Sequence, residues 1–231
     1  MPVAGLVASA FANSALLAAT ALVSVTLVAI PLGIAAAVRR GTWTDLAIGL
    51  VAYCGTAMPE FVTATLLIVF LAGPDSGIFP AGGFVSPSED FWGFAGHVVL
   101  PATALSLVLA AHIARQTRSE MADVLASDYV RAARLKGLPE RLVLRRHALP
   151  NALAPTIAVI SLDVGYLLGG IIVVEEIFAW PGLGRLLIYA LENRDLPVIQ
   201  GVTLVLAMVY AASNLVSDLL IAAIDPRVRY A

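Results

Sequence analysis

Residues 11–38 read FANSALLAATALVSVTLVAIPLGIAAAV and contain no Asp, Glu, Lys or Arg. An α-helix rises about 1.5 Å per residue, so about 20 apolar residues cross a hydrocarbon layer about 30 Å thick. This run is therefore long enough to span a membrane. It is followed directly by Arg39 and Arg40, and basic residues of this kind flank the cytoplasmic ends of spanning helices.

Four further apolar runs follow along the chain, at 46–72, 96–115, 149–174 and 198–224. Of the 231 residues, 60% are hydrophobic and only 13% are charged, whereas an average soluble protein has about 25% charged residues. Ala, Gly, Ser and Thr are frequent in the runs, which suits close helix packing in a membrane. We predict an all-α, polytopic membrane helical bundle that forms one domain over 1–231 with five spans.

The basic residues are distributed unequally between the two sides of these spans. Only Arg185 and Arg194 fall on one side, and the other twelve of the 14 Lys and Arg residues fall on the opposite side. Because cytoplasmic loops are enriched in Lys and Arg, we expect a multi-pass protein of the cell (inner) membrane. The start of this chain would lie outside and its C-terminus in the cytoplasm, with the loops 73–95 and 175–197 outside.

The cytoplasmic segment 116–148 is large enough to fold as a unit. Its stretch RAARLKGLPERLVLRRHALPN (131–151) holds six of the 14 Lys and Arg residues. Ser127 is a suitable N-cap for a short helix over 128–136, and Gly137 is suited to end that helix in a left-handed conformation. Pro139 can be the first residue of a second helix. We predict two short helices that reverse direction at Gly137.

The first of these helices carries an apolar set of Tyr129, Val130, Ala132 and Ala133 beside basic residues such as Arg131. Small side chains allow close approach of another molecule, and an aromatic ring with a basic rim is typical of a docking surface. Two alternatives stay open at this point. The segment could be a loop that only follows the positive-inside rule, or it could hold its basic surface against anionic lipid.

Several classes of function are not indicated by the sequence. The net charge of −2 and the lack of a basic arm argue against a nucleic-acid partner. No phosphate-binding loop, zinc-protease motif or nucleophile elbow is present, so we expect no catalytic residue and no cofactor, and any ATP hydrolysis belongs to a separate chain. Cys54 is the single cysteine, and His97, His112 and His147 are scattered, so we expect no metal site.

Three acidic residues, Glu60, Asp163 and Asp218, fall in or near the predicted spans. A carboxylate inside a bilayer needs a partner or a wet cavity. Asp163 lies near the middle of span 149–174, where it could line a solute pathway or serve an interhelical hydrogen bond. Asp218 is expected to have a structural partner. Glu60, which follows Pro59, has no role that the sequence indicates.

The charged segment resembles the cytoplasmic loop of the membrane-spanning permease subunits of ATP-binding-cassette (ABC) importers. That loop reads Glu-Ala-Ala, three residues, Gly, nine residues, Ile-x-Leu-Pro. Here Arg131 replaces the Glu and His147 the Ile, while Ala132, Ala133 and Gly137 match. Both departures fit the dipeptide/oligopeptide/nickel branch, in which DYVRxARxKGL and RHALxNA are typical. Four further matches are LPATALSLVLAAHIARQTRSEM (100–121), GYLLGGIIVVEEIFAWPGLGRLL (165–187), LPVIQGV (196–202) and DPRVRY (225–230).

This resemblance implies the fold of a type I ABC importer permease that forms half of a pathway for peptides or related small solutes. The implied partners are a second permease subunit, ATPase subunits, an extracytoplasmic solute-binding protein and membrane lipid. The loop around WPGLGRLL would be re-entrant and near the pathway, with Glu175 and Asp163 as pathway residues. A plain turn after Trp180 is the alternative. The implied ATPase-coupling residues are Asp128, Tyr129, Val130, Arg131, Ala132, Ala133 and Gly137.

Members of this branch usually begin with one more membrane helix, so we expect this chain to lack that first helix. Two other functions remain open from the sequence. An ion-coupled secondary transporter could use Asp163 and Asp218 as proton or cation sites, although no internal symmetry is visible. A membrane scaffold without transport activity could bind lipid through its basic loop.

Overall fold

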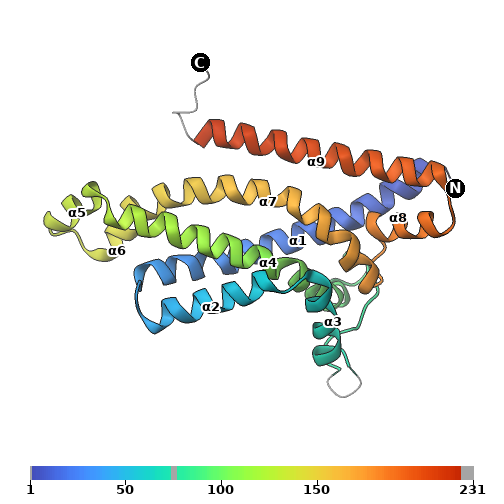
Figure 1. The fold of residues 1–231 in the computed structure, drawn as a ribbon, viewed down its shortest axis with the longest axis horizontal. Helices are drawn as coiled ribbons and strands as arrows, with labels where there is room; N and C mark the ends of the chain where they lie inside the picture. Colours follow the sequence, from blue (N-terminus) through green and yellow to red (C-terminus); the bar gives the residue numbers. More distant parts are fainter. Residues whose placement is uncertain (1, 74–76, 225–231) are drawn as a thin grey trace. The chain divides into compact units, whose positions relative to one another are not determined.

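The computed structural model describes residues 2–73 and 77–224, and every regular element in this part of the chain is helical (Figure 1). Residues 74–76 of the predicted loop 73–95, Arg227, Arg229 and the motif DPRVRY lie outside the described residues. The elements are α1 (Val3–Val38), α2 (Trp43–Ala57), α3 (Glu60–Leu71), α4 (Phe91–Ala126), α5 (Asp128–Leu135), α6 (Glu140–Leu142), the π-helical turn η1 (Val143–Ala148), α7 (Leu149–Ile177), α8 (Leu183–Glu192) and α9 (Leu196–Ile224).

Four helical stretches among the described residues are long and apolar enough to cross a membrane. They are α1, α4, α9 and the continuous stretch from Glu140 to Ile177. The pair α2 and α3 makes a fifth span if it is counted as one. The predicted all-α membrane bundle is therefore confirmed. Several helices run past the predicted ends of their spans, and α1 already begins at Val3.

The predicted span 46–72 is not one continuous helix. Helix α2 ends at Ala57 and α3 begins at Glu60, with Pro59 between them at φ −59° and ψ 147°. Proline has no N–H for the helical ladder, and it disfavours the helical conformation of the residue before it, here Met58. The physical cause of the break was thus visible in the sequence, but a packed membrane helix can also tolerate a proline.

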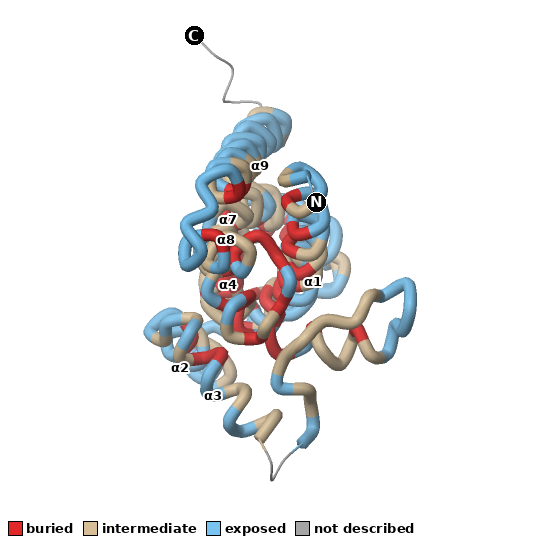
Figure 2. Tube along the Cα trace, turned by 90° about the vertical axis from the view of Figure 1, so that its right-hand side faces the viewer, coloured by how far each residue is buried: buried red, intermediate tan, exposed pale blue. Residues whose placement is uncertain are grey.

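The described residues form two compact units, and each is described by itself. The first takes its described residues from 2–25, 58–73, 77–108 and 164–212. Phe178 and Trp180 are fully buried in it. The ring of Phe84 meets that of Trp180 edge to face at 4.9 Å, and the indole N–H donates to the Asn13 carbonyl at 3.0 Å. Figure 2 marks such buried stretches in red, while most of α9 is exposed.

The second unit takes its described residues from 26–57, 109–163 and 213–224. Small side chains dominate one of its core clusters, which contains Ala37, Met121, Ala122, Ala148 and Ala152. Helices α1 and α4 are in close contact at Gly33, where an added Cβ would overlap the Ala114 carbonyl oxygen and Thr117. Close backbone approach of this kind is how membrane helices gain packing energy.

A Gly33→Ala variant should therefore unfold more easily than the wild type. The added methyl group meets backbone, which cannot rotate away, so we expect a loss of about 1–3 kcal/mol in the free energy of unfolding. Gly49→Ala is the matched control, because a Cβ at Gly49 meets no atom within 4 Å. Denaturation of the purified protein in detergent measures both, and equal stability of the two variants would contradict the close contact at Gly33.

Candidate functional site

Helix α5 has one face turned into the protein and one face exposed. Val130 is fully buried and Ala133 is 6% exposed, and both pack in a cluster with Val143. On the other face, Tyr129 is 46% exposed and Leu135 is 83% exposed. The inward contacts hold α5 in place, and the outward side chains are free to contact another molecule.

The chain reverses directly after α5 at Gly137, as predicted. Gly137 has φ +75°, a conformation that residues with a Cβ disfavour. The Gly137 N–H donates to the Arg134 carbonyl at 2.9 Å, and the Leu138 N–H donates to the Ala133 carbonyl at 3.4 Å. This pair of bonds is a Schellman motif, and its usual apolar contact is supplied by Leu138 packing into the cluster of Val130 and Ala133.

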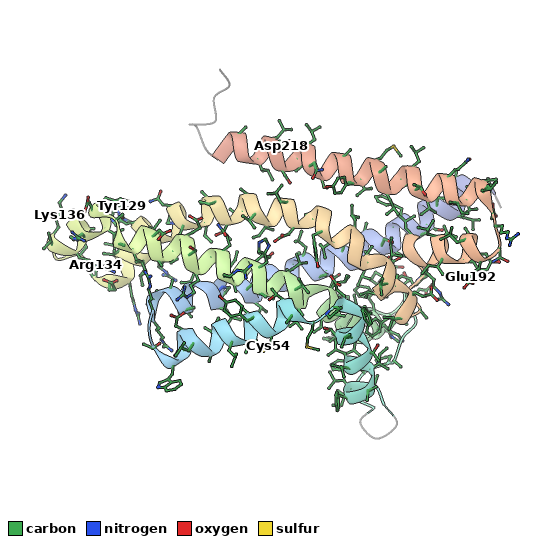
Figure 3. All side chains as sticks on the ribbon, viewed as in Figure 1. Cys54, Tyr129, Arg134, Lys136, Glu192 and Asp218 are labelled. Carbon is green, nitrogen blue, oxygen red and sulfur yellow. The ribbon has the colours of Figure 1, made fainter. Side chains whose placement is uncertain are left out.

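An ion pair also joins the two sides of the reversal. The Arg134 guanidinium donates to both carboxylate oxygens of Glu140, at 2.7 and 3.2 Å. Tyr129, Arg134 and Lys136 lie together around α5 and the reversal that follows it (Figure 3). The second ion pair on α5, between Arg131 and Asp128, is 3.8 Å long and exposed to solvent, so it adds little stability.

Two details after the reversal differ from the prediction. Pro139 is the N-cap residue of α6 and not its first helical residue. The helix then does not run regularly into α7, because η1 is a π-helical turn in which the Leu149 N–H donates to the Leu144 carbonyl. Pro150 has no N–H to donate to the Arg146 carbonyl. The π-helical turn accommodates this proline because its hydrogen bonds do not follow the regular α-helical pattern.

The structure divides the predicted coupling residues into two groups. Asp128, Tyr129, Arg131, Ala132 and Gly137 are exposed, whereas Val130 and Ala133 are buried. The two buried residues therefore shape the segment from within and are not exposed on its surface, and the assignment of all seven to coupling stays a prediction. Sequence reasoning missed Leu135, a large apolar side chain on the exposed face, whose helical spacing from Ala132 and Arg131 was the available signal.

Asp163 is buried beside His112. Its Oδ1 lies 3.0 Å from Nδ1 of His112, which is itself partly exposed. Its Oδ2 is buried, and among the described residues it has no hydrogen-bond partner. The structure thus brings together two residues that the sequence analysis treated separately, as a pathway candidate and a scattered histidine.

Glu175 is fully buried and holds the start of α8. One of its carboxylate oxygens accepts from the Ser14 hydroxyl at 2.5 Å, and the other accepts from the Gly184 N–H at 2.7 Å. The Ser14 oxygen in turn accepts from the Leu183 N–H at 2.8 Å. A carboxylate at a helix N-terminus satisfies free N–H groups and suits the helix dipole. The stretch WPGLGRLL is therefore a short connection that leads into a capped helix.

An added Cβ on Gly182 would overlap the Glu175 carboxylate, and one on Gly184 would overlap the backbone of Ile172. These two glycines are therefore needed for space, and neither has a positive φ. They allow the connection after Trp180 to lie directly on the end of α7.

The remaining acids have different settings. Glu60 accepts from the Tyr166 hydroxyl at 3.0 Å. Asp218 is exposed on α9 (Figure 3), so the structural partner expected for it is not found among the described residues. Asp45, which sequence reasoning did not single out, is buried and forms a two-pronged ion pair with Arg118. Within the described ranges, no three His, Cys, Asp or Glu residues are grouped as metal ligands would be.

Comparison with known proteins identifies the kind of protein that this chain resembles. Residues 29–230 match the family described as "binding-protein-dependent transport system inner membrane component". The glutathione transport system permease protein GsiC of Salmonella typhimurium is 41% identical over 229 residues, which cover 99% of this chain and 72% of that protein. The oligopeptide transport system permease protein AppB of Bacillus subtilis is 38% identical over 231 residues, covering 99% of this chain and 73% of that protein.

A crystal structure of an amino acid ABC transporter with histidines has a similar fold. Its TM-score is 0.69 at 15% sequence identity, and the match covers 95% of this chain and 94% of that one. At this level of identity the likeness concerns the fold alone.

Proposed function

This chain belongs to the inner-membrane components of binding-protein-dependent transport systems, and from this membership we propose that it forms half of the solute pathway of an ATP-driven importer. It is a multi-pass, non-catalytic permease subunit of an ABC importer, so an ion-coupled secondary transporter is not favoured. A second permease subunit would complete the pathway. ATP would be hydrolysed by separate ATPase subunits.

The coupling to the ATPase would run through the exposed face of α5. The observation that carries this proposal is the combination of an exposed apolar and basic surface, with Tyr129, Ala132 and Leu135, and a buried face anchored by Val130 and Ala133. A surface whose opposite face is packed against the protein can transmit a displacement to the helices beyond it. A mobile loop would move without displacing them. Closure of the ATPase subunits would thus move α5 together with α4, which directly precedes it in the sequence, and with η1, whose Val143 packs against Val130 and Ala133.

The solutes we propose are peptides or related small molecules. The relatives at 38–41% identity are named as permeases for oligopeptides and for glutathione, a small peptide-like compound. A solute-binding protein would deliver the solute on the extracytoplasmic side. The segment 116–148 would face the cytoplasm, because it carries seven of the 14 Lys and Arg residues and adjoins an eighth, Arg115.

An Ala132→Trp variant tests the coupling surface. Ala132 is exposed, so the larger side chain leaves the fold of α5 intact but prevents close seating on a partner. We expect the variant to be inserted at the wild-type level, to lose co-purification with the ATPase subunit and to lose ATP-dependent uptake. Ala132→Ser, which keeps the side chain small, should retain both.

Ala133→Trp makes a useful comparison, because Ala133 is buried and the variant should also lower the stability of the segment. Protease digestion of the charged segment distinguishes the two effects, with faster cleavage expected only for Ala133→Trp. An Ala132→Trp protein that still binds its ATPase and transports at the wild-type rate would exclude α5 as the coupling surface.

For the pathway, Asp163→Asn keeps the side-chain shape and removes the charge beside His112. If the charge takes part in moving the solute, we expect uptake to fall by about tenfold, which corresponds to about 1.4 kcal/mol in the rate-limiting step, at an unchanged level of protein. Asp218→Asn is the control, since Asp218 is exposed on α9. Unchanged uptake of every tested solute by the Asp163→Asn protein would leave only a structural role for this residue.

A further inference from the structure

A groove of about 350 Å³ lies between α2 and α4 in the second unit. Its lining residues are contributed by one stretch of each helix: Asp45, Leu46, Ile48, Gly49, Leu50, Ala52 and Tyr53 from α2, and Ala114, Arg115 and Arg118 from α4. The stretch of α2 from residue 45 to residue 53 extends over about 12 Å. Most of this wall is apolar, and the charged residues gather at one end.

The two arginines at the charged end are in different electrostatic situations. Arg118 donates to both carboxylate oxygens of Asp45, at 2.5 and 2.8 Å, and Asp45 also accepts from the Gly41 N–H at 3.0 Å. The charge of Arg118 is thus matched within the protein. Arg115 lies one helical turn earlier on the same face of α4, and its exposed side chain has no hydrogen bond or ion pair with another described residue. The groove therefore offers an unmatched positive charge.

The surroundings of the charged end are those of a membrane–water interface. Trp43 begins α2 and is 86% exposed, and Arg39 and Arg40 are exposed in the preceding turn. Tryptophan is enriched at the level of the lipid headgroups, and basic residues flank it there. From this level the groove runs along apolar side chains such as Leu46 and Leu50. A ligand that fits needs an anionic group at one end and an extended apolar chain.

We infer that this groove binds one anionic phospholipid, with its phosphate paired to Arg115 and one acyl chain lying between α2 and α4. The charge complementarity favours a lipid over an apolar membrane helix, because such a helix seated in the groove would bury Arg115 without an anion, which is unfavourable. Basic pockets between membrane helices bind anionic headgroups for the same physical reason. The inference concerns a site apart from α5 and does not depend on which solute is transported.

The test uses native mass spectrometry of the importer purified through this chain, with phosphatidylglycerol or phosphatidylcholine of identical acyl chains added. We expect the wild-type protein to retain phosphatidylglycerol preferentially and Arg115→Gln to retain it about fivefold less well, the effect of one basic residue at a lipid surface. Arg115→Lys should restore retention. Arg145→Gln, which removes the same charge from an exposed residue of η1, is the control.

The acyl chain is tested separately by filling the groove. Gly49 lines it, and a Cβ there meets no atom within 4 Å, so Gly49→Phe should place its ring in the groove and displace the lipid. Gly169→Phe is the matched control, since Gly169 on α7 is also open and does not line the groove. Equal retention of both lipids by all variants would show only unspecific surrounding lipid. Loss of another subunit from Gly49→Phe, with lipid unchanged, would show that a protein covers the groove. Either result overturns the inference.

Discussion

Replacing Gly182 with alanine is expected to destabilise the first unit strongly. The new methyl group would overlap the Glu175 carboxylate, which is fully buried and held by Ser14 and Gly184. Neither the carboxylate nor the backbone of residue 182 has room to move, so we expect a loss of at least about 1–3 kcal/mol in the free energy of unfolding. Gly169→Ala, at an open helical position, should instead leave stability unchanged or raise it slightly.

Glu175→Ala should be still more destabilising when made alone. It leaves the Ser14 hydroxyl and the Gly184 N–H buried without their acceptor, at about 1–3 kcal/mol for each unsatisfied group. The two substitutions should not add, because the alanine at position 182 has no carboxylate to overlap once Glu175 is removed. Denaturation of the two single variants and the double variant forms a double-mutant cycle. Additive losses of stability would contradict the contact between Gly182 and Glu175.

Replacing Gly137 with valine is expected to weaken coupling strongly without preventing membrane insertion. Gly137 has φ +75°, and a residue with a Cβ loses about 1–2 kcal/mol in this conformation, with β-branched residues worst. The Schellman turn would then open in part of the molecules, and α5 would no longer present its exposed face in a fixed position. We expect ATP-dependent uptake to fall by roughly five- to thirty-fold, as a free-energy loss of this size implies.

A graded series separates backbone strain from other causes. Asn tolerates the left-handed conformation, so Gly137→Asn should retain most uptake, Gly137→Ala less and Gly137→Val least. Gly41 provides the matched control, because it has φ +78° in the turn between α1 and α2 and is equally open. Gly41→Val should lower stability to a similar degree but leave the coupling of ATP hydrolysis to uptake intact. Equal uptake by Gly137→Val and Gly41→Val would remove the special role of the turn after α5.

The local features of the charged segment were predictable because they depend on neighbours in the sequence. The reversal at Gly137 and the start of the next helix near Pro139 follow from backbone preferences of a few adjacent residues. Ser127 is the N-cap residue of α5 as predicted, but its hydroxyl donates to the Val124 carbonyl and forms no cap hydrogen bond with α5. The direction in which α5 faces was not predictable in this way. Val130 and Ala133 are turned inward because Leu138 and Val143 pack against them, and nothing in the composition of α5 distinguishes its apolar residues from one another.

The polar contacts inside the bundle could not be derived from the sequence. Ser14 and Glu175 are 161 residues apart, and His112 and Asp163 are 51 apart, so no periodicity links the partners. The pattern indicated only that a buried acid needs a partner or water. In the structure Glu175 and Asp163 each have such a partner, Ser14 and His112 respectively. Which residue becomes the partner depends on how helices distant in the sequence pack.

The π-helical turn η1 affects the direction in which the segment before it, including α5, faces relative to α7. A π-helical turn accommodates one residue more than an α-helical turn, and each residue of an α-helix turns the chain by about 100°. The extra residue in 143–148 thus changes the angle about the helix axis between the segment before it and α7. Without this offset, an α7 in its present orientation would be joined to a Val143 turned away from Val130 and Ala133, which it now contacts. The direction in which the proposed coupling surface on α5 faces therefore depends on one extra residue in η1, which does not itself belong to that surface.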